Sequence, residues 1–214
     1  GATSVVISAR IMWIEGADAF NLTPYQGEEL KPVRSYTYDN EKLTPYSYEA
    51  ELDDNNMAVK YAVSHQSAIY KIEFRQADKP VYILVNSRIG SMHANAKGIS
   101  GHQRLNKNTN IYLYIEPEQT PIQTGILEDG KLVDSQTKAE GRNACAVWRF
   151  ADGTQQVNLR YGISFISADL FIIKSSLHII SFIRAIRVRS RNESPVNFSI
   201  SSLSLHVIRV MAMQ

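Results

Sequence analysis

A run of alternating apolar and polar residues between positions 46 and 74 constrains this chain more than any other feature. Apolar side chains occupy every second position in residues 46–52, and the alternation recurs in residues 57–63 and 69–74. This two-residue period is typical of a β-strand with one buried face. Polar segments at residues 53–56 and 64–67 separate the runs and favour tight reversals. The sequence therefore predicts a three-stranded antiparallel meander.

The same patterning extends over the rest of the first 167 residues. Strands are expected at residues 4–14, 81–86 (central in a sheet), 93–104, 110–116, 122–127, 144–150 and 155–167. We interpret residues 128–131 as a turn and residues 151–154 as the turn of a hairpin joining the last two strands. Residues 20–31 and 35–41 read as loops. Turn-forming residues recur about every 8–12 positions, and no long amphipathic helix is visible, so the fold class is all-β, an antiparallel β-sandwich.

Composition excludes several classes of protein. The formal net charge is +2, which gives no reason to expect a nucleic acid partner. No run of about 18 apolar residues is present, so no membrane span is expected. Cys145 is the single cysteine, which rules out an internal disulfide, and its apolar neighbours indicate a buried core thiol.

Residues 168–214 differ from the part before them. They contain two acidic and six basic residues and are rich in Ile and Ser. We therefore divide the chain into a β-sandwich domain at residues 1–167 and an atypical tail at residues 168–214. The tail is interpreted either as extra strands, at residues 178–190 and 196–210, or as an aberrant C-terminus created by a frame shift near Ala168.

Several motifs, in a fixed order, resemble one known family. They are YDNE (38–41), PYSY (45–48), LDD (52–54), YKIEF (70–74), GISG (98–101), IYLYI (111–115) and VNLRYGISFIS (157–167). Together they resemble the N-terminal β-sandwich domain of glycoside hydrolase family 92, over roughly residues 15–167. The resemblance implies a supersandwich of the galactose-mutarotase type. The family's usual entry motif, NPFIGT, is absent from this chain.

The resemblance also implies a function and a division of labour. Members of the family are calcium-dependent exo-acting α-mannosidases, in which the sandwich packs on a catalytic (α/α)6 domain. The general acid, the general base and the calcium ligands belong to that catalytic domain, so no catalytic residue, metal ligand or cofactor is assigned to this chain. The expected partners are a mannose-containing glycan and the catalytic domain. By resemblance to exported bacterial enzymes, we expect a secreted, periplasmic or cell-surface protein that is inactive as an isolated chain.

Five residues are candidates for contact with carbohydrate. They are Trp13, Tyr38, Glu41, His93 and His102. The two histidines flank the GISG motif and could face a sugar, although a structural histidine is the alternative for each. The aromatic rings could stack on a sugar ring, but aromatic side chains of a sandwich are often core residues. Two carboxylates two residues apart, Asp39 and Glu41, could approach the spacing of about 6.5–9.5 Å that an inverting glycosidase requires, or could be a solvated loop end.

Metal binding has weak support in the sequence. Residues 53–56, Asp-Asp-Asn-Asn, offer side-chain oxygens for calcium but lack the glycine and distal glutamate of a known calcium loop, so a hairpin turn is the preferred interpretation. The five histidines show no spacing typical of metal ligands.

Three functions therefore stay open. The first is a non-catalytic N-terminal domain, or fragment, of an α-1,2-mannosidase-like glycoside hydrolase that supports catalysis and glycan binding. The second is a stand-alone carbohydrate-binding module. The third is a structural domain that dimerises, with the tail strands forming the interface of a homo-oligomer.

Overall fold

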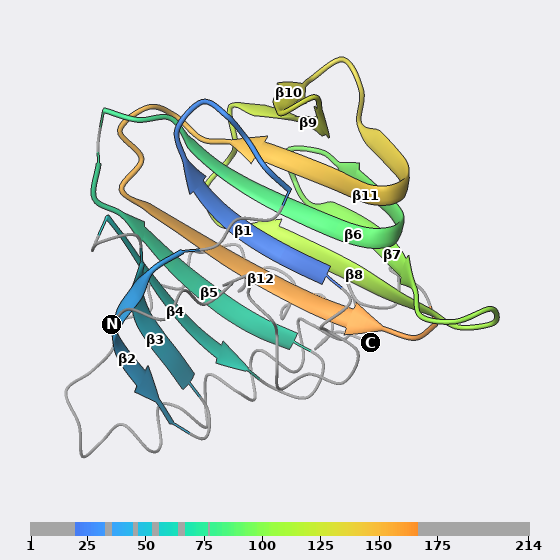
Figure 1. The fold of residues 1–214 in the computed structure, drawn as a ribbon, viewed down its shortest axis with the longest axis horizontal. Helices are drawn as coiled ribbons and strands as arrows, with labels where there is room; N and C mark the ends of the chain where they lie inside the picture. The colour runs from blue at the N-terminus through green and yellow to red at the C-terminus, as the bar shows by residue number, and fades with distance from the viewer. Residues whose placement is uncertain are drawn as a thin grey trace, which may run out of the picture. The chain divides into compact units, whose positions relative to one another are not determined.

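The computed structural model describes residues 20–32, 36–44, 47–52, 56–63, 67–76 and 78–166. These residues form twelve β-strands and no helix (Figure 1). The strands are β1 (Phe20–Gln26), β2 (Tyr38–Leu43), β3 (Ser47–Leu52), β4 (Met57–Val63), β5 (Ser67–Phe74), β6 (Val81–Ala94), β7 (Ile99–Arg104), β8 (Asn110–Pro117), β9 (Gln123–Glu128), β10 (Lys131–Val133), β11 (Lys138–Arg149) and β12 (Gln156–Ser164). Within this part of the chain, no helix is long and apolar enough to cross a membrane.

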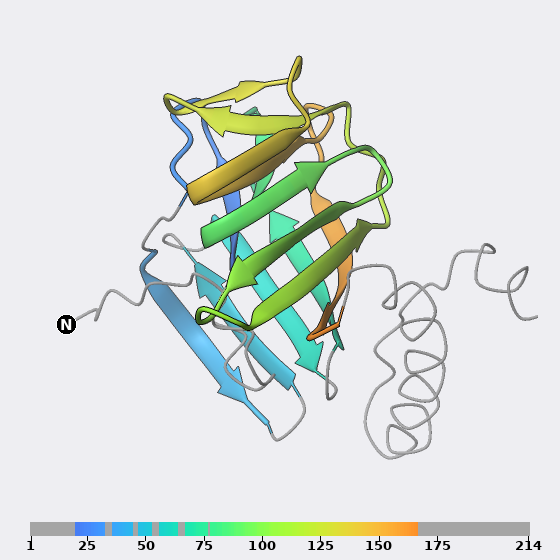
Figure 2. The same cartoon turned by 90° about the vertical axis from the view of Figure 1, so that its right-hand side faces the viewer.

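The strands form one antiparallel sheet that folds over on itself. Its order is β10-β9-β11-β6-β7-β8-β12-β5-β4-β3-β2, and β1 pairs with β6. Figures 1 and 2 show β11, β6, β7 and β8 in one layer and β5, β4, β3 and β2 in the other, with β12 beside β8 where the sheet turns. The fold class predicted from the sequence, an all-β antiparallel sandwich, is confirmed.

One large apolar core fills the space between the layers. Trp148 of β11 and Tyr161 of β12 are both fully buried in it, together with Phe20 of β1 and Tyr70 of β5. Each strand contributes alternate residues to this core, because successive side chains of a strand point to opposite faces. The two layers therefore hold together by burying their inner faces against each other.

The meander is confirmed at β3, β4 and β5. Ala50 and Leu52 of β3 lie opposite Val59 and Met57 of β4, and all four side chains are buried. Glu49 and Lys60, on the opposite faces of the same strands, are not buried, so the predicted inward and outward alternation is correct. The turn predicted at residues 53–56 falls outside the described residues, apart from Asn56.

Two predicted loops are strands. Residues 20–26 form β1, which pairs with β6 from Phe20↔Ser87 to Gln26↔Val81. Pro24, which suggested a loop, lies in the middle of this strand, where its missing N–H costs nothing because β1 pairs on one side only. Residues 38–43 form the edge strand β2, whose side chains after Tyr38 are all exposed, and a strand without a buried face leaves no alternation to detect.

The strand predicted at residues 93–104 is two strands. β6 continues to Ala94, a turn follows at residues 95–98, and β7 begins at Ile99. The Asn95 side chain makes this turn by accepting hydrogen bonds from the backbone N–H groups of Lys97 (2.8 Å) and Gly98 (3.0 Å).

The hairpin predicted at residues 144–167 is wrong. The turn exists, since Thr154 N donates to Ala151 O at 3.1 Å. However, β11 pairs with β6 and β9, whereas β12 pairs with β5 and β8. Turn residues reverse the chain but do not specify the partner strand, and this turn passes the chain from one layer to the other.

β6 changes both its partner and its inward face near its centre. Val85 points into the main core, as does Met92, an odd and an even position of the same strand. The inversion occurs at Arg88 and the facing Asn143, whose φ of 55° lies in the left-handed region. Before this kink β6 pairs with β1, and after it with β7.

A smaller cluster covers the first half of β6 and β11 on their other face. It consists of Tyr25, Leu30, Leu84, Cys145 and Val147. The second half of the same two strands has no such cover, so their outer face is available to solvent beyond the kink.

Candidate functional site

The outer face of β11, β6, β7 and β8 gathers most of the polar and aromatic side chains with binding potential. Figure 2 looks onto these four strands. The strand registers align their outward residues in three rows: the arginine row (Arg142, Ile89, Arg104, Asn110), the His102 row (Glu140, Ser91, His102, Tyr112) and the His93 row (Lys138, His93, Ser100, Tyr114). Their inward neighbours, including Met92, Ile99 and Leu113, are buried in the core and fix the rows in place.

His102 is the centre of the second row. Its Nδ1 shares a hydrogen bond of 2.8 Å with Ser91 Oγ on β6. On the other side its ring lies 6.0 Å from the ring of Tyr112 on β8, tilted by 46°. The imidazole is therefore oriented from both neighbouring strands, while its Nε2 edge and the Tyr112 ring stay partly exposed.

Two charged residues of β11 border the rows. Lys138 and Glu140 form an exposed ion pair. The hydrogen bond from Lys138 lowers the pKa of Glu140 below its usual range, with smaller contributions from the charges of Lys138 and His102. Glu140 is therefore a carboxylate at neutral pH and can accept hydrogen bonds at the edge of the face.

Tyr114 ends the third row and depends on a glycine. A Cβ atom at Gly98 would lie 2.7 Å from the Tyr114 hydroxyl oxygen, so only glycine leaves room for this ring. Burial raises the pKa of Tyr114, and the neighbouring charge of Glu116 raises it further. The GISG motif thus seats an aromatic ring on the outer face.

The five residues predicted from the sequence do not form one site. His93 and His102 lie on adjacent strands of the outer face, with Ser91 and Ser100 as their cross-strand partners. Tyr38 and Glu41 lie on β2, the edge strand at the end of the sheet. Trp13 lies outside the described residues.

Tyr38 and Glu41 have different surroundings from each other. Tyr38 packs against the main core and is half-buried, whereas Glu41 is exposed. Glu41 interacts with the phenol of Tyr48 on β3, whose pKa is raised mainly by burial and further by this carboxylate. The strand register shifts between Asp39 and Lys42, and Asn40 has a φ of 51°, so the outward spacing expected of the two carboxylates is interrupted by a bulge.

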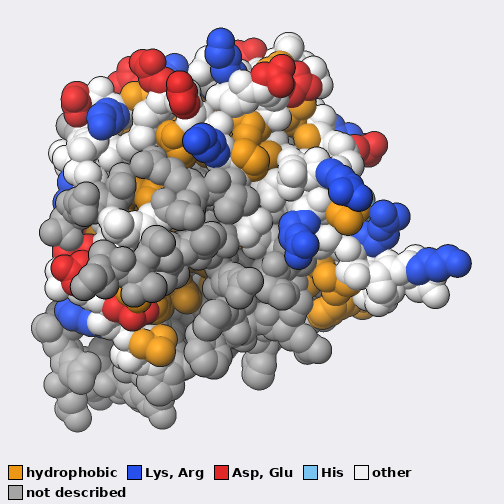
Figure 3. All heavy atoms as spheres, in the orientation of Figure 1, with side chains coloured by type: hydrophobic (Ala, Val, Ile, Leu, Met, Phe, Trp, Pro, Cys, Tyr) orange, Lys and Arg blue, Asp and Glu red, His pale blue; other side chains and the backbone are white. Residues whose placement is uncertain are grey.

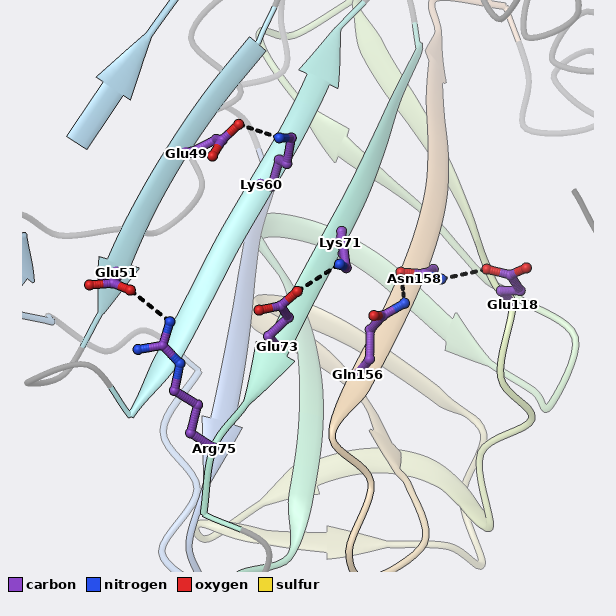
Figure 4. A network of polar contacts seen from close by, with 9 residues as sticks. All are labelled: Glu49, Glu51, Lys60, Lys71, Glu73, Arg75, Glu118, Gln156 and Asn158. Atoms are coloured by element: carbon purple, nitrogen blue, oxygen red, sulfur yellow. Dashed lines mark hydrogen bonds and ion pairs between the residues drawn. The ribbon is translucent and has the colours of Figure 1, made fainter. Parts of the chain in front are cut away.

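A second polar surface lies on the outer face of β3, β4, β5 and β12. Figure 4 shows it as a chain of matched partners. Arg75 binds Glu51 at 2.6 Å, Lys71 binds Glu73 at 2.6 Å, and Lys60 binds Glu49. The hydrogen bonds from Arg75 and then Asn40 lower the pKa of Glu51. Because its charges are paired within the strands, this surface has less capacity to hold a ligand.

The sequence gave no reason to single out Ser91, Tyr112 or Tyr114. Residues 110–116 do alternate, and the tyrosines occupy the outward positions, but which strands would lie beside them was not visible. Among the described residues, no three His, Cys, Asp or Glu side chains come together as a metal site. His65, His178 and His206 lie outside this part of the chain.

The fold and the outer face together define a β-sandwich domain with an exposed polar and aromatic sheet surface. Residues 8–164 match the sequence profile of the glycosyl hydrolase family 92 N-terminal domain. The chain belongs to this family. No curated protein sequence matches it.

Solved structures agree with the family. The family GH92 inverting mannosidase BT2199 from Bacteroides thetaiotaomicron VPI-5482 superposes with a TM-score of 0.64 at 20% identity, over 89% of this chain and 25% of that one. The family GH92 α-mannosidase BT3965 from Bacteroides thetaiotaomicron gives 0.61 at 20% identity, over 71% and 25%. The gh92 family glycosyl hydrolase ccman5 gives 0.63 at 16% identity, over 81% and 27%. The chain therefore spans about a quarter of the length of the enzymes whose fold it shares.

Proposed function

We propose that this chain acts as the non-catalytic N-terminal domain of an α-mannosidase-like glycoside hydrolase, where it supports a catalytic domain and contributes to glycan binding. The family match over residues 8–164 is the observation that carries this proposal. The sandwich accounts for only about a quarter of each similar mannosidase, which leaves room there for a separate catalytic part.

The outer face around His102 is the part we assign to glycan contact. Hydroxyl groups of a sugar need hydrogen-bond donors and acceptors, and its ring faces pack on aromatic side chains. Ser91, His102 and Glu140 supply polar groups, and Tyr112 supplies a partly exposed ring, within one cross-strand row.

Calcium and export follow as further parts of the proposal. A calcium site needs about six to eight oxygen ligands, and the described residues bring no three acidic or histidine side chains together. We therefore place any calcium requirement in the catalytic domain of a longer protein and route no step through this chain. Export to the periplasm or cell surface rests on resemblance to the family, and fractionation of cells that make the full protein would test it.

Titration of the purified chain with α-1,2-mannobiose, followed by calorimetry and by amide chemical shifts, tests the glycan contact. We expect weak binding without release of mannose, and shifts centred on β6, β7 and β8. Tyr112→Ala and His102→Ala should each weaken binding about tenfold, the effect of one lost stacking or hydrogen-bonding partner. Gln156→Ala, on the second polar surface, is the matched control.

The same titration separates the two alternatives. Binding together with release of mannose by the chain alone would disprove the non-catalytic role. No binding by any variant would leave support of a catalytic domain as the remaining function and would remove glycan contact, including the stand-alone carbohydrate-binding module, from the proposal.

A further inference from the structure

The arginine row lies directly beside the His102 row, on the same face. Arg142 is the cross-strand partner of Ile89, and the pairing of Gly90 with Gln103 places Ile89 opposite Arg104. All three side chains are exposed. Neighbouring strands lie about 4.8 Å apart, so the Cα atoms of the two arginines are roughly 10 Å apart, with the apolar Ile89 between them.

These arginines have no acidic partner within the described part of the chain. Six arginines lie in that part, and three of them, Arg75, Arg149 and Arg160, bind Glu51, Asp152 and Glu116. The other three, Arg88, Arg104 and Arg142, form no ion pair there. All three lie at the kink of β6 and β11 or in the row next to it. Figure 3 shows Lys and Arg side chains gathered on the side of the molecule where these strands end.

Guanidinium groups recognise phosphate, sulfate and carboxylate through paired hydrogen bonds. Two of them flanking an apolar side chain can converge on one anionic group held above Ile89. The His102 row follows two residues further along each strand, about 7 Å away, which is comparable to the length of one sugar unit. The face therefore offers an anion position beside a position suited to a polyol.

We propose that Arg104 and Arg142 form an anion subsite, so that the outer face binds a glycan bearing a phosphate, sulfate or carboxylate group. This inference rests on the proposed glycan contact and names the class of glycan. An acidic protein surface would also complement the arginines. The adjoining Ser91, His102 and Tyr112 favour a sugar, because they present hydroxyl, imidazole and ring surfaces rather than further cations.

The test compares four probes on the full chain: mannose, mannose 6-phosphate, glucuronic acid and inorganic phosphate, each titrated by calorimetry and amide chemical shifts. We expect mannose 6-phosphate to bind about tenfold more tightly than mannose or inorganic phosphate, since it alone engages both positions. Glucuronic acid, compared with mannose, shows whether a carboxylate substitutes for the phosphate. In salt of about 1 M, where the Debye length falls to about 3 Å, the advantage over mannose should disappear.

Three variants locate the effect. Arg104→Gln and Arg142→Gln should each remove most of the advantage of mannose 6-phosphate while leaving mannose binding unchanged. Arg160→Gln, the same substitution on β12 at an arginine already paired with Glu116, should leave the advantage intact. Unchanged unfolding midpoints would show that the variants are folded.

Equal affinity for mannose and mannose 6-phosphate would overturn the anion subsite while leaving the proposed glycan contact standing. Inorganic phosphate binding as tightly as mannose 6-phosphate would overturn the glycan assignment, because it would show a site for a free anion. An equal loss in Arg160→Gln would overturn the location. Failure of mannose to bind, with Tyr112→Ala indistinguishable from the parent chain, would count against the proposed function instead.

Discussion

Gln103 Oε1 accepts a hydrogen bond of 3.0 Å from the backbone N–H of Ile89, at the point where β6 exchanges β1 for β7. The same oxygen accepts from Ser87 Oγ at 2.9 Å, and Gln103 Nε2 donates to the carbonyl of Arg104 at 2.8 Å. A side chain thus replaces the missing strand partner, because a buried backbone N–H must find an acceptor. This contact holds the kink that exposes the arginine row.

Replacing Gln103 should therefore destabilise the fold. Gln103→Leu leaves Ile89 N and Ser87 Oγ without their acceptor and should lower the free energy of unfolding by about 1–3 kcal/mol. Denaturant unfolding followed by tryptophan fluorescence measures it. Gln136→Leu, at an exposed glutamine, is the control, and equal stability of the two variants would contradict the role given to Gln103.

Gly101 should tolerate no side chain. A Cβ atom there would lie 2.5 Å from Met92 Sδ and would overlap the backbone oxygen of Ser91, which cannot move without breaking the β6–β7 pairing. Gly101→Ala should cost about 1–3 kcal/mol of stability, the usual cost of overpacking a core. Thermal unfolding checks this against Ser100→Ala, an outward position on the same strand, which should stay close to the parent chain.

The sequence predicted the parts of this fold that depend on local pattern. β3, β4 and β5 each have one face in the core, so Leu52 and Ile72 mark their inward sides unambiguously. The pattern fails where β6 inverts at Arg88, because a kink puts Val85 and Met92 on the same side despite their spacing. It also fails at residues 151–154, where the turn was visible but the partner strands were not.

The candidate site could be predicted only in part, for the same reason. His93 and His102 flank a turn, so their closeness follows from a short stretch of sequence. The neighbours Tyr112 and Arg142 come from strands distant in the chain, and only the register of the sheet brings them together. Conversely, Tyr38 and Glu41 shared a motif with the family but lie at the far edge of the sheet.

Cys145 should be unreactive in the folded chain. Burial raises the pKa of its thiol to about 12, so almost no thiolate exists near neutral pH. We expect a thiol reagent at about pH 8 to label it only after unfolding, with a rate that follows the fraction of open molecules. Rapid labelling of the folded chain would contradict the burial of the small cluster around Val147.

The last prediction concerns a stack of four tyrosines that crosses β3, β4, β5 and β12. Tyr48 and Tyr61 have ring centroids 5.2 Å apart, Tyr61 and Tyr70 also 5.2 Å, and Tyr70 and Tyr161 5.6 Å. The Tyr70 and Tyr161 hydroxyl oxygens are buried without a hydrogen-bond partner among the described residues. Burial raises the pKa of both phenols well above the usual value.

These phenols should make the fold sensitive to alkali. Their contribution to stability is fully present below about pH 10, where the unfolded chain keeps its tyrosines protonated, and it is lost as the pH rises further, because the unfolded state releases protons that the folded state retains. Each phenol adds a slope of up to about 1.4 kcal/mol per pH unit. Tyr70→Phe and Tyr161→Phe should each reduce that slope and leave stability near pH 7 unchanged or slightly higher, since no hydrogen bond is lost. Denaturant unfolding between about pH 7 and pH 11 measures both effects, with Tyr112→Phe on the outer face as the control. A large loss at neutral pH in either core variant would show that the hydroxyls have a partner after all.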